Sequence, residues 1–260
     1  MKQTLKKMWE RLNSKAMISF NSTNLSGNLI EVEVSKDEID SKLNNAWKDP
    51  QVPQRQFDMY TRNQLKDYRK GVPIEPFDIL VDILRESISN TENTILEIGC
   101  SSGYYKEVLK IKGINMEYHG CDYSEAFITF AKKLFPGIDF QVQDARSLTY
   151  PDNCFNIVIS GCCLLHILEY EKAIRETARV AKDYVIFHRT PVLHKKETSY
   201  YNKTAYGIKM FEIHFNEREL IKLFKKNGLR IIDIITFNAS LEETTKDFYA
   251  YKTYLCEKNK

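Results

Sequence analysis

The chain has 260 residues, which is long enough for one large α/β domain with an additional segment. Its 38 Lys and Arg residues and 35 Asp and Glu residues leave a formal net charge of +3, too small to favour a nucleic acid or an anionic membrane as a partner. The basic start of the chain is not followed by a continuous apolar run, so the sequence predicts neither a secretory signal nor a membrane span. We therefore expect a cytoplasmic protein.

Residues 1–76 are predicted to form a largely helical N-terminal extension. A short strand is expected over 29–34, and helical stretches are expected near 36–47 and 54–70. Aromatic residues in this region are spaced like helix faces, which predicts that the extension packs over the rest of the protein as a cap. A structural appendage with no part in a functional site is the alternative.

Strands and helices alternate in residues 77–260, which we predict to be the main domain. An amphipathic helix beginning at Phe77 leads into a strand that ends at Ile98. The alternation implies parallel strands joined by right-handed crossovers, with ligands at the carboxyl ends of the strands. Further strands are expected over 116–121, 138–142, 155–160 and 184–187, and helices over 105–111, 124–135 and 169–181.

The last part of the chain departs from this alternation. A helix over 216–227, with Asn216 and Glu219 as a capping box, is followed by strands over 229–237 and 248–256. Two consecutive strands joined by a loop predict an antiparallel hairpin at the end of the sheet.

Small residues follow directly after the first strand of the main domain. Gly99 and Gly103 allow backbone angles that a side chain would forbid, and helical spacing resumes at Tyr104. Such a turn directs free backbone N–H groups and the positive end of a helix at a bound ligand. The next two strands each end at an acid, Asp122 and Asp144.

In four stretches the chain resembles a class I S-adenosylmethionine-dependent methyltransferase. The stretches are Leu96-Glu97-Ile98-Gly99-Cys100-Ser101-Ser102-Gly103, Gly120-Cys121-Asp122-Tyr123-Ser124, Gln143-Asp144-Ala145, and Phe155-Asn156-Ile157-Val158-Ile159-Ser160 followed by Leu164-Leu165-His166. The resemblance covers about residues 77–256. It implies an α/β, Rossmann-like three-layer sandwich whose seven-stranded, mostly parallel sheet ends in an antiparallel hairpin, with the N-terminal helical extension added to it. It also implies S-adenosylmethionine as the cofactor and S-adenosylhomocysteine as the product.

The resemblance implies a role for each polar position in these stretches. Glu97 would face the amino group of the cofactor's methionine part, and Asp122 would bind the ribose hydroxyls at a strand end. Asp144 and a backbone N–H group would form hydrogen bonds with the adenine. The expected cofactor-binding residues are Glu97, Gly99, Ser101, Gly103, Asp122, Tyr123, Asp144 and Ala145, with the Tyr123 ring as a candidate for stacking on adenine. Ser101 departs from the family pattern, which usually has a glycine there.

The glycine turn has two other possible interpretations. Residues 99–103 match the G-x-S-x-G pattern of a hydrolase nucleophile elbow, but at most one short strand and no His-Gly-Gly run precede them. A dinucleotide-binding G-x-G-x-x-G pattern fails because Ser101 and Tyr104 stand at two of its glycine positions. The methyltransferase interpretation is therefore preferred.

Methyl transfer from a sulfonium is an in-line displacement, so the protein chiefly aligns the acceptor and excludes water. We expect the acceptor to be a hydroxyl of a small molecule or glycan, which needs a base to remove its proton. His166, after the fourth strand, and His188, in the loop expected after the fifth strand, are the candidate bases, and packing roles are the alternatives.

Residues 194–215 are predicted to form a lid-like insertion over the acceptor. Its aromatic side chains suit stacking on a sugar or another ring, and an ordinary packed insertion is the alternative. The candidate substrate residues are Arg189, Tyr200, Tyr201 and Tyr206.

No metal is expected, because the cysteines show no zinc-site spacing and residues 160–163 offer no cluster of acids after the fourth strand. No Asn-Pro-Pro-Tyr-type motif follows that strand, which disfavours methylation of nucleic-acid base amines. Two other functions stay open: a S-adenosylmethionine-binding protein without catalysis, and a methyltransferase acting on protein or RNA. The oligomeric state is left open.

Overall fold

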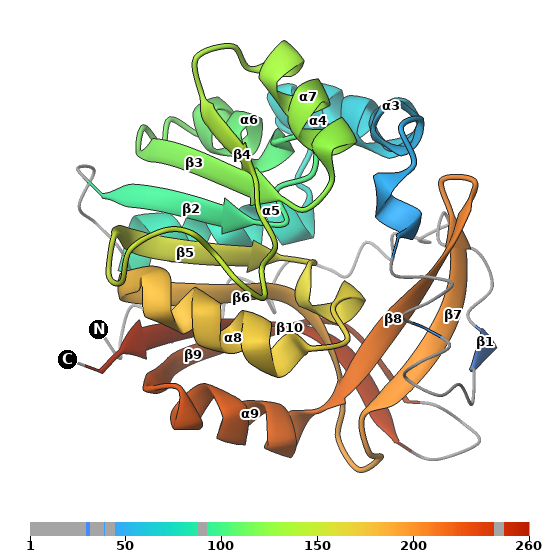
Figure 1. Cartoon of the computed structure of the whole chain (residues 1–260), viewed down its shortest axis with the longest axis vertical. Coiled ribbons are helices and arrows are strands. Elements are labelled where there is room, and N and C mark those ends of the chain that lie inside the picture. Colours follow the sequence, from blue (N-terminus) through green and yellow to red (C-terminus); the bar gives the residue numbers. More distant parts are fainter. Residues whose placement is uncertain (1–29, 32–38, 40–44, 88–92, 242–246, 260) are drawn as a thin grey trace.

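A single mixed sheet runs through the protein in the computed structural model, which describes residues 30–31, 39, 45–87, 93–241 and 247–259 (Figure 1). Seven of its ten strands form the predicted core. In spatial order they are β4 (Asp139–Val142), β3 (Glu117–Asp122), β2 (Thr94–Ile98), β5 (Phe155–Gly161), β6 (Ala181–Leu193), β10 (Phe248–Lys258) and β9 (Leu229–Leu241). The pairs from β4 to β6 are parallel, and β10 is antiparallel to both β6 and β9. The predicted Rossmann-like sheet with its terminal antiparallel hairpin is confirmed.

Alternating side chains of the central strands feed two hydrophobic cores, one on each face of the sheet. In β2, Ile95 belongs to one core and Leu96 to the other, and both are fully buried. A strand buried on both faces reads as a nearly continuous apolar run, which is why the pattern of residues 94–98 predicted it.

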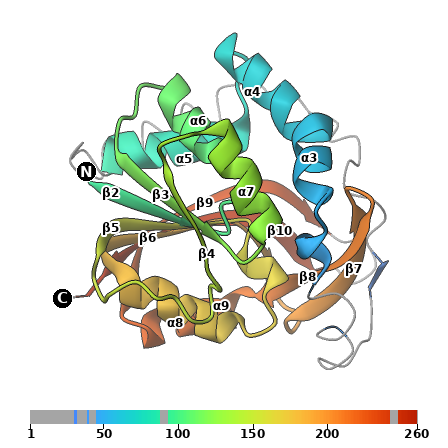
Figure 2. The same cartoon turned by 45° about the horizontal axis from the view of Figure 1, so that its top comes forward.

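Helices cover both faces and complete the three layers (Figures 1 and 2). The core that contains Ile95 receives side chains from α5 (Glu75–Asp82), α6 (Tyr104–Ile111) and α7 (Glu125–Leu134). Helix α5 continues directly into the π-helical turn Ile83–Ser87. The opposite core receives them from α8 (Tyr170–Val180) and α9 (Glu217–Lys226). Half of the predicted capping box of α9 is present: the Asn216 side chain accepts a hydrogen bond from the Glu219 N–H at 3.1 Å, whereas the Asn216 N–H donates to the Thr198 hydroxyl at 3.0 Å.

The described part of the N-terminal extension lies beside α6 and α7 (Figure 2). It consists of the 3-10 turn η1 (Ala46–Lys48), α3 (Val52–Gln56), the π-helical turn η2 (Phe57–Thr61) and α4 (Arg62–Arg69). These elements agree with the helix expected near 54–70. Only Ile30–Glu31, a two-residue strand β1, is described from the strand expected over 29–34, and most of 36–47 lies outside the described residues.

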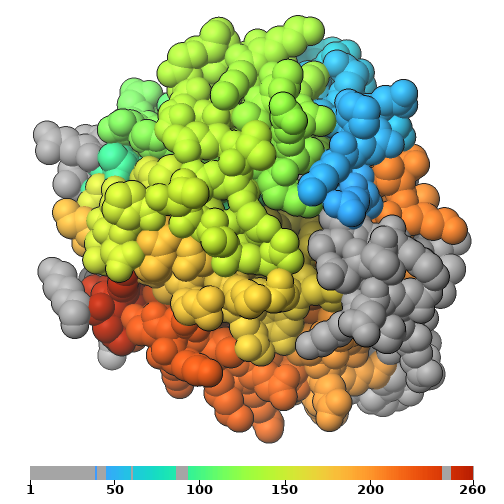
Figure 3. Space-filling model, viewed as in Figure 1, coloured from blue at the N-terminus to red at the C-terminus, as the bar shows by residue number. Residues whose placement is uncertain are grey.

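The predicted lid-like insertion is a β-hairpin that enlarges the sheet. Strands β7 (Ser199–Ala205) and β8 (Ile208–Asn216) pair antiparallel, and β8 continues the sheet by parallel pairing with the end of β6. Tyr206 and Gly207 form the two-residue turn with φ of 53° and 76°, the left-handed angles that a tight hairpin turn requires. In Figure 3 the blue N-terminal segment reaches the orange tip of this hairpin.

Strand β6 is longer than the sequence indicated, because it continues from residue 187 to Leu193. His188 is therefore part of a strand, and the prediction that it begins a loop is wrong. Arg189 within this strand has φ of 58°, and the pairing with β10 is irregular opposite it, between Lys252 and Tyr254. Such a bulge redirects a side chain without ending the strand.

Among the helices of the described residues, none has the length and apolar character needed to cross a membrane.

Candidate active site

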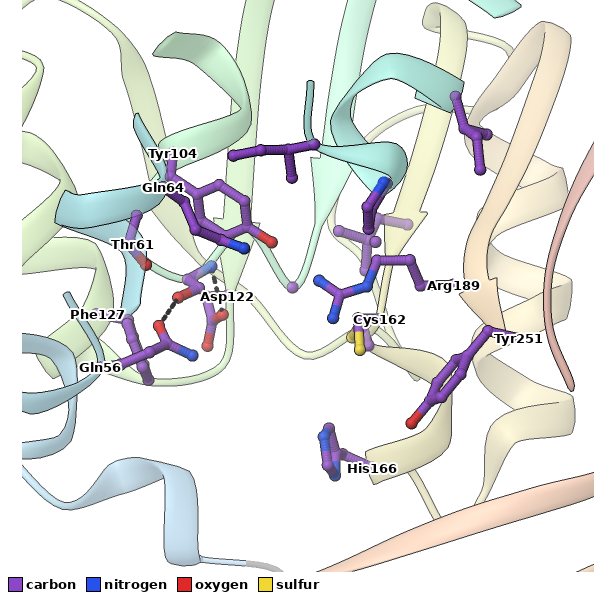
Figure 4. Close-up of a pocket in the computed structure, with 18 of the residues that line it drawn as sticks. Gln56, Thr61, Gln64, Tyr104, Asp122, Phe127, Cys162, His166, Arg189 and Tyr251 are labelled. Atoms are coloured by element: carbon purple, nitrogen blue, oxygen red, sulfur yellow. Dashed lines mark hydrogen bonds between the residues drawn. The ribbon is translucent and has the colours of Figure 1, made fainter. Parts of the chain in front are cut away.

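A large cavity of about 1920 Å³ opens at the carboxyl ends of the parallel strands. It exceeds the roughly 300–1,000 Å³ of a typical ligand pocket, so it has room for two ligands side by side. Figure 4 shows two groups of side chains in it: Gln56, Thr61, Gln64, Tyr104 and Asp122 on one side, and Cys162, His166, Arg189 and Tyr251 on the other. The N-terminal segment and the β7–β8 hairpin close its outer side, where the Arg55 side chain donates a hydrogen bond to the Tyr206 carbonyl at 2.8 Å.

The turn after β2 is shaped by close packing at Gly99. This residue has φ of +69°, and a Cβ atom placed on it would lie 2.4 Å from the Cys163 sulfur. Only glycine fits, because both the angle and the space exclude a side chain. Gly99 lines the cavity, whereas Gly103, the residue before α6, does not and instead packs against Phe140.

Ser101 takes the same left-handed conformation, with φ of 53°, which explains why the related pattern has a glycine there. Its backbone N–H donates to Asp122 Oδ2 at 3.0 Å, and its hydroxyl donates to Gln56 Oε1 at 2.6 Å (Figure 4). The serine therefore ties the turn to β3 on one side and to the N-terminal segment on the other.

Asp122 ends β3 with its carboxylate at the cavity wall, as predicted. Besides the bond from Ser101, Oδ1 accepts the Ser124 N–H at 3.0 Å. Burial raises the pKa of Asp122 to about 6, although the backbone hydrogen bonds oppose the shift. The Tyr123 N–H also bonds to this carboxylate, and a carboxylate has about four lone-pair sites, so Asp122 keeps capacity to accept a hydroxyl donor such as one of a ribose.

Asp144, Ala145 and Tyr123 also line the cavity, at the ends of β4 and β3. The Asp144 carboxylate is held by Arg146, whose Nη2 lies 2.7 Å from Oδ2. Burial raises the pKa of Asp144, but the hydrogen bonds and charge of Arg146 outweigh it and leave the pKa below its usual value. The Lys48 ammonium lies 5.3 Å from the centre of the Tyr123 ring. These residues fit the predicted adenine side of the site.

Glu97 does not line the cavity, contrary to the prediction that it faces the ligand. It is 1% exposed, and the Tyr118 hydroxyl donates a hydrogen bond to its Oε2. Its Oε1 lies under Gly161, where a Cβ atom would approach it to 3.4 Å. Burial raises the pKa of Glu97 to about 8, so this carboxyl group sits below the floor of the cavity and readily holds a proton.

His166 lies in the short 3-10 helix Leu164–His166 after β5 and faces the cavity (Figure 4). Its Nδ1 is 2.8 Å from the Phe211 carbonyl oxygen. A carbonyl only accepts, so Nδ1 carries the proton and Nε2 of the neutral ring keeps its lone pair. Burial lowers the pKa of His166, which favours this neutral form. The predicted site position of His166 is observed.

His188 is absent from the cavity wall. It is fully buried, its Nδ1 is 2.8 Å from the Thr253 hydroxyl, and its ring packs against Tyr105. Burial and the neighbouring Arg189 charge lower the pKa of His188 well below its usual value. It is a core residue, and its expected role as a base is not supported by this position.

The predicted substrate residues separate into two groups. Arg189 and Tyr206 line the cavity. Tyr200 packs against the hydrophobic core, and the Tyr201 ring lies 4.1 Å from the His214 ring, so neither reaches the cavity wall. Tyr200 and Tyr201 are successive residues of β7 and therefore face opposite sides of the hairpin, Tyr200 towards the hydrophobic core and Tyr201 towards His214.

Several wall residues were not predicted from the sequence. Trp47 packs on His166 with ring centres 4.9 Å apart, and the hydroxyl of Tyr251 points towards the same histidine (Figure 4). The other unpredicted residues include Gln56, Thr61, Gln64, Tyr104, Cys162, Lys203, Met210 and Glu212. The period-two apolar pattern of residues 211, 213 and 215 was a usable signal for β8 and hence for the residues beside it.

Together, the fold and the site define a nucleoside-binding domain of Rossmann-like type. Residues 96–187 match the family model described as a methyltransferase domain. The chain is 33% identical over 93 residues to ajmaline N-methyltransferase from Rauvolfia serpentina, and 30% identical over 88 residues to demethylmenaquinone methyltransferase from Paenarthrobacter aurescens. The matches cover 34% of this chain in each case, and 32% and 34% of those proteins, so they span about a third of each relative.

A solved structure extends the likeness of fold. The 1,6-didemethyltoxoflavin-N1-methyltransferase from Burkholderia thailandensis, with bound 1,6-didemethyltoxoflavin and S-adenosylhomocysteine, superposes with a TM-score of 0.55 at 13% identity, covering 89% of this chain and 95% of that one. The matched region, residues 96–187, and the fold are those of the class I S-adenosylmethionine-dependent methyltransferase superfamily.

The residues at the cavity fit the cofactor of this superfamily, S-adenosylmethionine. Asp122 keeps acceptor capacity for the ribose, Ala145 and Asp144 stand at the adenine side, and the Gly99 turn presents backbone beside them. Within the described residues, no three His, Cys, Asp or Glu side chains are grouped so that they could hold a metal ion.

Proposed function

We propose that the protein transfers the methyl group of S-adenosylmethionine to a hydroxyl group of a small molecule or glycan. The observation that carries the proposal is the divided cavity, with Asp122 on the cofactor side and a neutral His166 on the other. The sulfonium cofactor supplies an electrophilic methyl group with a neutral leaving group. The protein's part is to hold and align the acceptor and to keep water out.

His166 is the proposed base. The Phe211 carbonyl holds the proton on Nδ1, and Nε2 therefore takes the proton that the acceptor hydroxyl loses. Trp47 and Phe211 pack around the ring and fix its orientation. Enclosure by the N-terminal segment and the hairpin favours a small acceptor over a protein or RNA, which would need an open groove.

Calorimetry with S-adenosylhomocysteine tests the cofactor side. We expect binding by the wild-type protein and a loss of at least about tenfold in affinity for Asp122→Ala, because a charge-assisted hydrogen bond contributes about 1.5–3 kcal/mol. Asp152→Ala is the matched control, since Asp152 is an exposed partner of Arg179 away from the cavity. No binding, or equal binding by the Asp122 variant, contradicts the proposal.

Turnover on a panel of alcohols, phenols, sugars and amines tests the acceptor side. We expect His166→Ala to lower kcat by about 10²–10⁴ while leaving the Kd for S-adenosylhomocysteine unchanged. His119→Ala is the control, because that ring lies at the edge of β3 beside Asp139 and Glu117. Cofactor binding without turnover on any compound supports the non-catalytic alternative.

Methyl transfer to nitrogen is the second candidate. Its support is that two similar proteins, ajmaline N-methyltransferase and 1,6-didemethyltoxoflavin-N1-methyltransferase, carry nitrogen acceptors in their names. A neutral His166 can also take a proton from an amine. Preferential turnover of the amines over the matched alcohols in the same panel decides for this candidate.

A further inference from the structure

A buried ion pair stands in the cavity wall of the β7–β8 hairpin. Lys203 Nζ lies 2.6 Å from Glu212 Oε1, and the two side chains are only 11% and 4% exposed. Lys203 pairs with Met210 and Glu212 with Tyr201 in the strand register, so the two charged residues are diagonal neighbours on one face of the hairpin. Both residues line the cavity.

The second oxygen of Glu212 has no partner. Oε2 is buried, and no described residue donates a hydrogen bond to it. Burial raises the pKa of Glu212, but the charge and hydrogen bond of Lys203 oppose this effect, and the pKa lies below its usual value, so the group is ionised. A buried carboxylate oxygen without a donor costs free energy, and an ionised carboxylate can only accept. This oxygen is thus suited to a ligand that supplies an O–H or N–H group.

The same strand places Glu212 beside the proposed base. The Phe211 carbonyl holds His166, and Glu212 is the next residue in β8. Both side chains line the same cavity. The acceptor end of the cavity therefore offers two hydrogen-bond acceptors near one another, Nε2 of His166 and Oε2 of Glu212.

We propose that Glu212 determines acceptor specificity by binding a second hydrogen-bond donor of the acceptor molecule. The inference rests on the proposed methyl transfer. The acceptor is then a compound with two neighbouring O–H or N–H groups, such as a diol, an amino alcohol or an aminophenol. One group loses its proton to His166 and receives the methyl group, and the other donates to Glu212 and is left unchanged. Lys203 is a positioning residue that holds the carboxylate.

Paired compounds test the proposal with the full-length chain and methyl-labelled S-adenosylmethionine. Catechol, ethylene glycol and ethanolamine each have two donors, and phenol, ethanol and ethylamine are their one-donor counterparts. We expect a KM at least tenfold lower for a two-donor compound than for its counterpart. Glu212→Gln should remove this ratio, because the amide can place a donor where the acceptor molecule also has one, while the Kd for S-adenosylhomocysteine stays unchanged.

Glu217→Gln is the matched control. Glu217 Oε1 also lies 2.6 Å from a lysine, Lys252 Nζ, in a buried pair, but neither residue lines the cavity. This variant should keep the two-donor preference. A preference that persists in Glu212→Gln, or equal KM values for both kinds of compound in the wild type, overturns the inference.

The remaining outcomes separate this inference from the proposed function. If S-adenosylhomocysteine binds but no two-donor compound is methylated or bound, the two-donor inference is wrong and the cofactor assignment stands. If S-adenosylhomocysteine does not bind to the wild-type protein, the proposed methyl transfer fails and the inference fails with it. Unchanged S-adenosylhomocysteine affinity in Glu212→Gln also shows that the variant is folded.

Discussion

At the scale of single residues, burial decides which acid faces the ligand and which one supports the fold. Glu97 is the next-to-last residue of β2 and Asp122 is the last residue of the neighbouring β3, yet only Asp122 reaches the cavity. Glu97 lies below it with Tyr118 as its hydrogen-bond partner. The sequence could place both acids at strand ends, but the depth of each side chain depends on what packs above it, here Gly161 from β5.

The buried carboxyl group of Glu97 should make stability depend on pH. Burial raises its pKa to about 8 in the folded protein, whereas the unfolded chain titrates near 4.5. Between these values the folded state binds more protons than the unfolded state, so stability falls as pH rises through this range. Each unit of difference in pKa corresponds to about 1.4 kcal/mol.

Glu97→Gln should therefore gain stability relative to wild type between pH 5 and pH 8, by at most about 1.4 kcal/mol per pH unit. Urea unfolding of the cofactor-free protein at the two pH values measures the difference. Glu117→Gln, an exposed change on the neighbouring strand, should behave like wild type. The same pH dependence in Glu97→Gln and wild type would show that Glu97 is ionised in the folded protein.

At the scale of elements, the turn between β2 and α6 depends on the position of the loop after β5. Gly99 is held against Cys163, so the first strand end and the fourth are packed together beneath the cavity. The glycine was recognised from the sequence as a turn residue, but its contact lies 64 positions further along the chain and has no local signal.

Gly99→Ala should be more destabilising than Gly113→Ala. The difference between the two losses of unfolding free energy measures the steric contact between residue 99 and Cys163. The two glycines have nearly equal φ, +69° and +73°, but a Cβ atom on Gly113 meets nothing within 4 Å. We expect about 1–2 kcal/mol for the backbone strain at Gly113 and about 1–3 kcal/mol more at Gly99. Denaturant unfolding measures both values. Equal losses would mean that Cys163 moves aside without cost.

The secondary structure of the insertion also belongs to this scale. Residues 194–215 are expected to be a lid-like insertion because aromatic and polar residues are mixed there, and the structure shows that they form two strands that extend the sheet. Phe211, Ile213 and Phe215 follow the period of a strand. The intervening Glu212 and His214 are polar, so the alternation is visible in the sequence, and only the structure shows that these two residues are buried as well.

At the scale of the whole molecule, the N-terminal segment, the sheet and the hairpin meet at one cavity. The Ser101–Gln56 and Arg55–Tyr206 hydrogen bonds join the segment to the other two parts. A ligand in the cavity therefore contacts, and should stabilise, all three parts together.

Saturation with S-adenosylhomocysteine should move one cooperative unfolding transition to higher temperature. At a ligand concentration of about 100 Kd, the free energy of unfolding rises by about 2.7 kcal/mol, which corresponds to an increase in Tm of roughly 5–10 °C for a chain of this size. Thermal unfolding followed by circular dichroism, with and without the ligand, measures the shift. Two separate transitions of which only one moves would show that the N-terminal segment unfolds independently of the site.

The sequence by itself determined the alternation of strands and helices, the glycine turn, and the acids at the end of β3 and just after β4. Each of these is visible locally, because periodicity, turn residues and strand ends involve neighbouring positions. Only the tertiary structure decided that His166 faces the cavity while His188 is buried, and that Glu212 lies beside His166. Those relations depend on the register of β6, β8 and β10, whose partners are far apart in the chain and are brought together only by folding.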